Sequence, residues 1–107
     1  MEISQTNLLR IYQKTNGHCF YCGSLNASQI DHFVAKKVYQ NFGISKEEVD
    51  PDRLENLFLV CQKCNLKKKD KSIPEFSENS NKMWRRYLRT NRRIIEFAGS
   101  EKEIVYQ

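Results

Sequence analysis

The sequence predicts a small α+β domain organised around a bound metal ion, and three observations support this prediction. The only four cysteines form two Cys-x2-Cys pairs that are separated by 38 residues. Two short apolar runs, at residues 29–34 and 57–60, have the length and composition of strands. Helical patterns occupy both ends of the chain. At 107 residues and 39% hydrophobic content, one small domain is expected, and a metal would add to its stability.

The N-terminal part predicts a helix, a tight turn and a strand. The helix is expected to begin at Ser4 or Thr6, which can cap it, and to run to about residue 16, where Gly17 would stop it. Residues 18–23 are predicted to form a tight turn that presents two thiolates. The strand at 29–34 carries an Asp-His dipeptide.

The middle of the chain predicts a long polar connection followed by a buried strand. Residues 35–55 are too numerous for an idle loop in a domain of this size, and residues 46–48 are expected to form a helical turn within them. The strand at 57–60 leads into the second cysteine pair. A short helix is predicted over residues 65–71, and Ile73-Pro74 would end it.

The C-terminal part predicts one long amphipathic helix over residues 80–98, capped near Ser77 or Ser80 and closed by Gly99. Its apolar face is expected to include Trp84, Tyr87, Leu88 and Asn91. We therefore expect a single domain over residues 1–107, composed of an N-terminal helix (1–17), a metal-framed core (18–71) and a basic helix with a tail (72–107).

Charge is distributed unevenly along the chain. The net charge is +5, and eleven of the eighteen lysines and arginines lie within residues 63–93. Five of the thirteen acids lie within residues 47–55. A basic surface of this kind favours a phosphate-bearing partner, most simply DNA. No run is long and apolar enough to span a membrane and no secretory leader is visible, so a cytoplasmic protein is expected. The oligomeric state stays open between a monomer and a homodimer.

The cysteines predict a structural zinc site formed by Cys19, Cys22, Cys61 and Cys64. Zinc prefers four thiolate or imidazole ligands in a tetrahedron, and each Cys-x2-Cys turn supplies two of them. A redox pair or plain core cysteines would be the alternatives, but two such pairs in a chain with four cysteines favour zinc.

A second group of residues offers the chemistry that phosphodiester hydrolysis requires. A neutral histidine such as His32 is a suitable base near neutral pH. Asp31 and Asn65 offer the oxygen ligands that a hard divalent cation prefers. Because neighbouring strand residues point to opposite faces, one residue of the Asp31-His32 pair would bind the metal while the other acts on water.

These residues resemble the HNH endonucleases in the version framed by two zinc knuckles. The similarity runs from Cys19 to Lys68 and includes Asp31-His32, Asn56-Leu57 and Cys61-Gln-Lys-Cys64-Asn65. The resemblance implies a ββα-metal fold, with His32 as general base and with Mg²⁺ or Mn²⁺ bound by Asp31 and Asn65. By the same resemblance, Asn56 would pin the loop and orient the histidine, and Lys68 would lie by the phosphate.

The sequence departs from the family pattern at two points. The third motif position, often histidine, is Asn65, as in the phage junction-resolving endonucleases, and asparagine disfavours Zn²⁺ or Ni²⁺ as the catalytic ion. The proline that usually follows Asp-His is missing, as are glycines of the next loop, so this loop is expected to serve a specific substrate.

A basic face on the C-terminal helix completes the prediction. Arginines dominate this face, and their mutual repulsion favours binding to nucleic-acid phosphates over a merely solvated surface. The candidate nucleic-acid-binding residues are Lys67, Lys69, Arg85, Arg86, Arg89, Arg92 and Arg93. The sequence thus predicts a metal-dependent DNA endonuclease. The alternatives are a non-catalytic zinc module that binds nucleic acid and a protein-interaction module that uses the acidic 47–55 segment.

Overall fold

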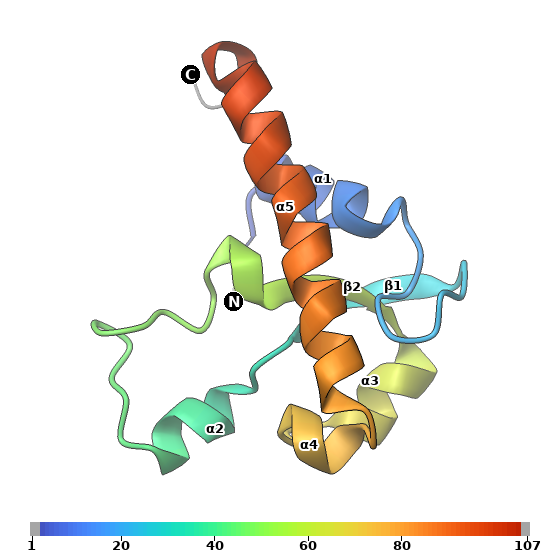
Figure 1. The fold of residues 1–107 in the computed structure, drawn as a ribbon, viewed down its shortest axis with the longest axis vertical. Coiled ribbons are helices and arrows are strands. Elements are labelled where there is room, and N and C mark those ends of the chain that lie inside the picture. Colours follow the sequence, from blue (N-terminus) through green and yellow to red (C-terminus); the bar gives the residue numbers. More distant parts are fainter. Residues whose placement is uncertain (1–2, 106–107) are drawn as a thin grey trace.

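A computed structural model describes the backbone of residues 3–105 and the side chains of residues 3–92. The fold is α+β, as predicted, with two strands and several helices (Figure 1). In chain order the elements are α1 (Gln5–Thr15), β1 (Ala27–His32), α2 (Lys36–Asn41), a 3₁₀ turn (Leu54–Asn56), β2 (Leu57–Cys61), α3 (Gln62–Lys68), α4 (Ile73–Phe76) and α5 (Ser80–Val105).

The two strands form an antiparallel pair in which Asp31 lies opposite Phe58 and His32 lies opposite Leu57. The first strand begins two residues before the predicted start and ends two residues before the predicted end. It ends at His32 because the next main-chain groups turn away to Asn56, whose main-chain oxygen accepts from the N–H of Phe33.

The first helix begins and ends as the sequence predicts. The Ser4 hydroxyl caps it by accepting from the N–H of Asn7. It ends in two residues with positive φ, Asn16 at 50° and Gly17 at 78°. The positive φ favours glycine at position 17, whereas the nearby ring end of Tyr12 belongs to an exposed side chain that can move.

The middle of the chain differs from the prediction in one missed helix, one helix start and the role of Ile73-Pro74. The long connection contains α2, which has no strong apolar periodicity and was not predicted. Helix α3 begins at Gln62, directly after the first cysteine of the second pair, three residues before the predicted start. Ile73 and Pro74 begin α4 rather than end a helix, since a capping box between Ser72 and Glu75 starts a new turn in which proline is tolerated.

The predicted boundaries and buried face of the last helix also need correction. Asn79 caps α5 through the N–H of Lys82, and the helix continues through Gly99 to Val105. Trp84 and Leu88 are 40% and 63% exposed. The residues turned toward the body of the protein lie at the spacing of an inner face: Met83, Arg86, Tyr87, Thr90 and Asn91.

An aromatic cluster joins α5 to the strands. The ring of Phe33 stacks on Tyr87 with centroids 4.7 Å apart, and Phe20 lies 4.1 Å from Phe58. Beside it, the ammonium group of Lys14 is buried over the Phe58 ring and donates to the main-chain oxygens of Leu54 and Leu57, each at 2.7 Å. Burial lowers the pKa of Lys14, although Glu55 partly offsets this effect. Lysine at this position therefore ties α1 to the beginning of β2.

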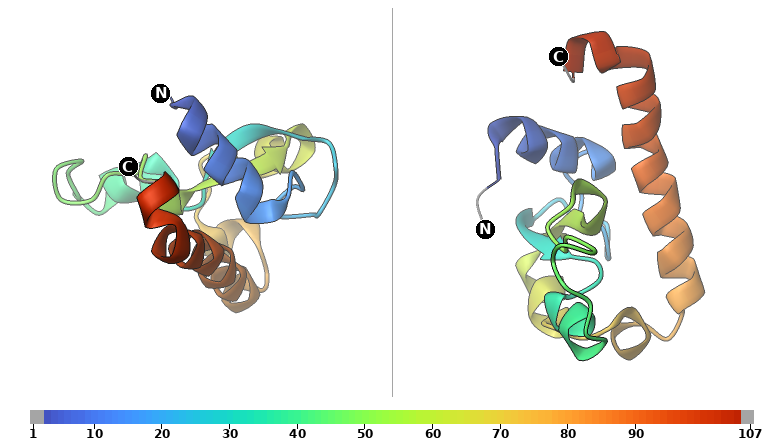
Figure 2. Two further views of the ribbon diagram at one scale, coloured as in Figure 1. Left: turned by 90° about the horizontal axis from the view of Figure 1, so that it is seen from above. Right: turned by 90° about the vertical axis from the view of Figure 1, so that its left-hand side faces the viewer.

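The two strands lie between α1 and α3, and α5 runs along one side of them, as Figure 1 and the right-hand view of Figure 2 show. Helix α2 and the connection after it extend to one side of the body (Figure 1). Within the described residues, no helix has the length and apolar character needed to span a membrane.

Candidate functional site

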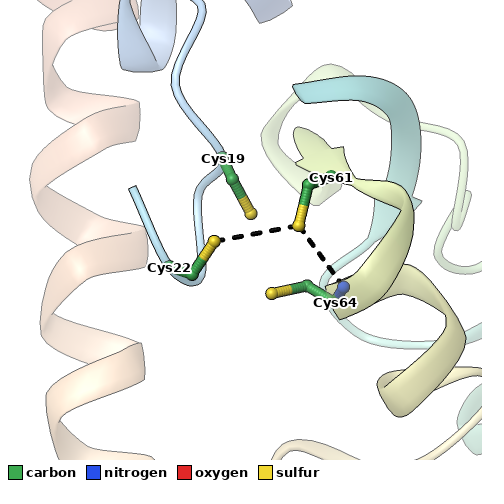
Figure 3. A group of neighbouring side chains, drawn as sticks. All are labelled: Cys19, Cys22, Cys61 and Cys64. Atoms are coloured by element: carbon green, nitrogen blue, oxygen red, sulfur yellow. Dashed lines mark hydrogen bonds between the residues drawn. The ribbon is translucent and has the colours of Figure 1, made fainter. Parts of the chain in front are cut away.

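The four cysteines converge at one point between α1 and α3. Cys19 and Cys22 come from the loop after α1, whereas Cys61 ends β2 and Cys64 lies in the first turn of α3 (Figure 3). Their sulfur atoms all lie within 4.8 Å of one another, and none of the four forms a disulfide. A tetrahedral ion with metal–sulfur bonds of about 2.3 Å requires sulfur atoms roughly 3.8 Å apart. The 3.7 Å separation of Cys22 and Cys61 fits that requirement.

Local contacts hold both Cys-x2-Cys turns in position, the first knuckle (residues 19–22) and the second knuckle (residues 61–64). The N–H of Cys64 lies 3.4 Å from the Cys61 sulfur, and this contact is the leading reason why the pKa of Cys61 falls to about 7. The guanidinium group of Arg86 donates to the main-chain oxygens of Phe20 and Tyr21, at 2.8 and 3.0 Å. The cluster is therefore positioned to hold a metal ion, and α5 braces the first knuckle.

Asp31 is buried in the interface between β1 and α3. One carboxylate oxygen, Oδ2, accepts from the Tyr21 hydroxyl at 2.7 Å and lies 3.2 Å from Nζ of Lys68. Lys68 is fully buried and also donates to the main-chain oxygen of His32 at 2.7 Å. Burial, together with the negative charge of Asp31, raises the pKa of Tyr21, so the tyrosine remains a donor. The sequence predicts that Lys68 lies by a substrate phosphate, and in this structure its ammonium group contacts Asp31.

Asn65 faces the same interface as Asp31. Its amide nitrogen donates to the side-chain oxygen of Gln29. Gln29 and Asp31 are two residues apart on a strand, and Asn65 and Lys68 are three apart on a helix, so each pair shares a face. Among the described residues, neither Asp31 Oδ1 nor Asn65 Oδ1 has a hydrogen-bond partner. These two oxygens belong to the ligand types that a hard cation prefers.

His32 points away from Asp31 and toward the acidic segment. Its Nε2 lies 2.6 Å from Oδ1 of Asp52, and the two side chains are 19% and 23% exposed. Lys36 approaches the same carboxylate oxygen at 3.6 Å. The hydrogen bond with His32 lowers the pKa of Asp52, and the charge of Lys36 acts in the same direction. The contact therefore joins His32 to an ionised carboxylate.

Asn56 is completely buried and ties both ends of the long connection together. Its side-chain oxygen accepts from the N–H of Val34 at 2.8 Å, and its amide nitrogen donates to the main-chain oxygens of Val34 and Pro51 at 3.0 and 2.9 Å. The chain on either side of the connection is thereby held next to the end of β1.

Asp31 and His32 line one hollow of about 480 Å³. Its other walls come from α2 and from the chain just after α3, and they carry Ala35, Lys36, Lys37, Gln40, Asn41, Lys69 and Asp70. Lys37 and Asp70 form an exposed ion pair of 3.4 Å between these two walls. The hollow is thus bordered by lysines from two elements.

The predicted nucleic-acid-binding residues fall into separate groups. Lys69 lines the hollow directly after α3, and Lys67 is exposed on α3. Arg85, Arg89 and Arg92 are exposed on α5, which runs apart from α3 (Figure 2). Arg86 instead turns inward to the first knuckle. The side chain of Arg93 lies outside the described residues.

Comparison with known proteins identifies the family. A family model described as HNH endonuclease matches residues 19–71, about half of the chain. The chain belongs to the HNH endonuclease family. The matched segment contains both cysteine pairs, both strands and α3, and the cluster and topology fit a zinc-stabilised ββα-metal fold. Among curated proteins, a comparison finds no match to this sequence.

Three contacts in this HNH segment escaped the sequence reasoning. They join Tyr21 to Asp31, Gln29 to Asn65 and Asp52 to His32. The alternation of a strand indicates that Gln29 shares a face with Asp31. No sequence pattern indicates that Asp52, twenty residues after His32, returns to it.

Proposed function

We propose that this protein is a metal-dependent endonuclease that hydrolyses DNA phosphodiester bonds in the hollow lined by Asp31 and His32. Membership of the HNH endonuclease family supports a nuclease. The observation that carries the finer proposal is that these two residues line one hollow while each has its own supporting contacts. One residue can therefore bind an ion while the other acts on water.

His32 is the proposed general base. Its Nε2 is engaged by Asp52, and its Nδ1 has no hydrogen-bond partner among the described residues. A neutral imidazole held in this way can accept a proton from a water molecule through Nδ1 as that water attacks phosphorus. The bond to the leaving oxygen of the DNA strand then breaks.

Asp31 and Asn65 are the proposed ligands of one Mg²⁺ or Mn²⁺ ion. Their Oδ1 atoms fit this role, because Asp31 Oδ2 and the Asn65 amide nitrogen already have protein partners. Such an ion, when bound, supplies positive charge to the phosphate and the leaving oxygen. The contact of Lys68 with Asp31 fixes the direction of the carboxylate.

Zn²⁺ is the proposed structural ion at the four cysteines. An all-sulfur donor set with this spacing suits zinc and does not suit magnesium. A site with four protein ligands has no open position for substrate. The zinc cluster therefore supports the fold, and the chemistry is assigned to the hollow.

DNA is the proposed substrate because lysine side chains line the hollow and arginine side chains are exposed on α5. Lys69 lines the hollow, Lys67 is exposed on α3, and the exposed arginines of α5 offer bidentate contacts to phosphate. A cytoplasmic location follows the same proposal. The alternative is a non-catalytic zinc module that binds nucleic acid. The exposed lysines and arginines would be enough for such binding without any cleavage.

Plasmid cleavage tests this function. Zinc-loaded protein is incubated with supercoiled plasmid, with and without Mg²⁺ or Mn²⁺, beside His32→Ala. His18→Ala is the matched control, because His18 is the only other histidine, is exposed, and within the described residues hydrogen-bonds only to main-chain oxygens near its own turn. We expect metal-dependent cleavage that falls about 10²–10⁴-fold in His32→Ala and is unchanged in His18→Ala. DNA binding without any cleavage would favour the alternative.

A further inference from the structure

Asp52 makes a contact with His32 that the proposed chemistry leaves unexplained. The two side chains meet through Nε2 and Oδ1 at 2.6 Å, across twenty residues of chain. Both are only partly exposed. An exposed ion pair contributes little to stability, commonly less than about 1 kcal/mol. The contact between His32 and Asp52 is therefore better explained by its effect on the imidazole ring than by a contribution to stability.

The position of Asp52 is fixed by its neighbours. Asn56 donates to the main-chain oxygen of Pro51, the residue directly before Asp52. The N–H of Asp52 donates to the Asp50 carboxylate at 2.9 Å. Since Asn56 is fully buried and also holds Val34, the carboxylate of Asp52 is attached to a rigid point near the end of β1.

This arrangement gives Asn56 an indirect effect on His32. Asn56 makes no hydrogen bond to the ring itself. Its contacts hold the beginning and the end of the connection, and Asp52 at the end of the connection reaches the ring. The chain of contacts runs from Asn56 through Pro51 to Asp52 and then to His32.

The contact also selects one form of the neutral ring. A carboxylate accepts hydrogen bonds, so the proton of a neutral imidazole must lie on the nitrogen that faces it. Nε2 therefore carries the proton and Nδ1 keeps its lone pair. Because His32 lines the hollow and Nδ1 has no partner among the described residues, the lone pair is available to a water molecule there.

We propose that Asp52 is a positioning residue for His32, which holds the ring in the Nε2–H form and leaves Nδ1 to accept the proton of the attacking water. This inference rests on the proposed function of His32 as general base. When Nδ1 takes that proton, the ring becomes a cation, its Nε2 proton stays in the hydrogen bond to Asp52, and the carboxylate stays ionised. The positive ring is then stabilised by the negative charge beside it.

Two variants and one control test the role of Asp52. Asp52→Asn keeps the size of the side chain but removes its charge and can donate as well as accept. Asp52→Glu restores the carboxylate. Glu47→Gln removes one negative charge from the same acidic segment at an exposed residue. Thermal melting confirms that each variant is folded.

The first measurement is the ring form of His32, read from its two nitrogen shifts by ¹⁵N NMR. It uses zinc-loaded protein without DNA or added Mg²⁺, at alkaline pH, so that the neutral ring is observed. We expect the Nε2–H form in the wild type and in Glu47→Gln, and a mixture of both forms in Asp52→Asn. An identical spectrum in Asp52→Asn and the wild type would overturn the inference.

The second measurement separates kcat from KM in DNA cleavage. We expect Asp52→Asn to lower kcat by about 10–100-fold with little change in KM, Asp52→Glu to recover part of this loss, and Glu47→Gln to match the wild type. An unchanged kcat in Asp52→Asn overturns the inference. If His32→Ala itself cuts at the wild-type rate, the proposed function fails instead, and the NMR result shows separately whether Asp52 still sets the ring form.

Discussion

The cysteine cluster and the hollow differ in how much of each can be recognised from local sequence spacing. Each Cys-x2-Cys turn presents two sulfur atoms of the cluster, although the two turns meet across 39 residues of chain. The hollow takes side chains from β1, α2 and the chain just after α3, and the contacts of its residues span 20 to 36 residues of chain. The comparison teaches that both regions depend on tertiary structure, but only the ligands of the cluster have a fixed local spacing. Changes at the cysteines should affect folding, and changes at the hollow should affect cleavage.

Removal of zinc should have the largest effect. We expect chelation, or the change Cys61→Ser, to abolish cooperative unfolding, because binding of structural zinc contributes about 10–16 kcal/mol in zinc-finger peptides, more than the stability of most small domains. Circular dichroism and metal analysis provide the measurement. A metal-free protein with the melting curve of the zinc form would show that the cluster is not needed for the fold.

Most of the fold could be predicted from local signals. The cysteine spacing, the Ser4 cap and the positive φ at Gly17 depend on neighbouring residues, and the structure confirms each of them. The boundaries of α3 and α4 were missed because they are set by a knuckle and by a capping box, each of which overrides apolar periodicity.

The hollow was predicted only in part. The resemblance to the HNH family indicated Asp31, His32, Asn56 and Asn65, and the structure places them around the end of β1 and the start of α3. The partners of these residues could not be predicted, because Asp52 and Lys68 reach them through tertiary contacts without any fixed spacing. Arg86 was misplaced for a related reason, since its partners are main-chain oxygens that no side-chain pattern reveals.

The buried pair of Asp31 and Lys68 offers a sharper test of the comparison, because it supports both the fold and the hollow. We expect Lys68→Met to destabilise the domain by about 3–5 kcal/mol, since it leaves a buried carboxylate without its counter-charge. The double variant Asp31→Asn, Lys68→Met should recover part of this loss. Urea denaturation measures both variants.

Lys67→Met is the matched control for this pair, because Lys67 is the exposed neighbour on the same helix. It should leave the unfolding free energy within about 0.5 kcal/mol of the wild type. Equal stability of Lys68→Met and Lys67→Met would contradict the structural role of Lys68 and return it to the substrate side of the hollow.

The two arginine environments of α5 should give the smallest effects. Arg86→Gln should lower stability by about 1–3 kcal/mol, because two main-chain oxygens of the first knuckle lose a charged donor. Arg89→Gln should leave stability unchanged and make the log–log dependence of DNA affinity on salt shallower by about one unit. Melting curves measure the stability of the two variants, and titration of two unrelated duplexes at several salt concentrations measures their DNA affinity. A shallower slope in Arg86→Gln and not in Arg89→Gln would reverse this assignment.

The central claim is that one chain holds two ions at two places, one for the fold and one for the chemistry. Binding of Mn²⁺ to zinc-loaded protein, followed by electron paramagnetic resonance, tests it most directly when the wild type is compared with Asp31→Asn. This change keeps an oxygen acceptor for Tyr21 and Lys68 but removes the charge that a hard cation needs. We predict one Mn²⁺ per chain in the wild type and one zinc in both proteins. Mn²⁺ binding should be at least about tenfold weaker in Asp31→Asn, because even the loss of a residue that only hydrogen-bonds to a ligand costs about 10–100-fold. Equal Mn²⁺ binding by the two proteins, or loss of zinc from Asp31→Asn, would contradict the claim.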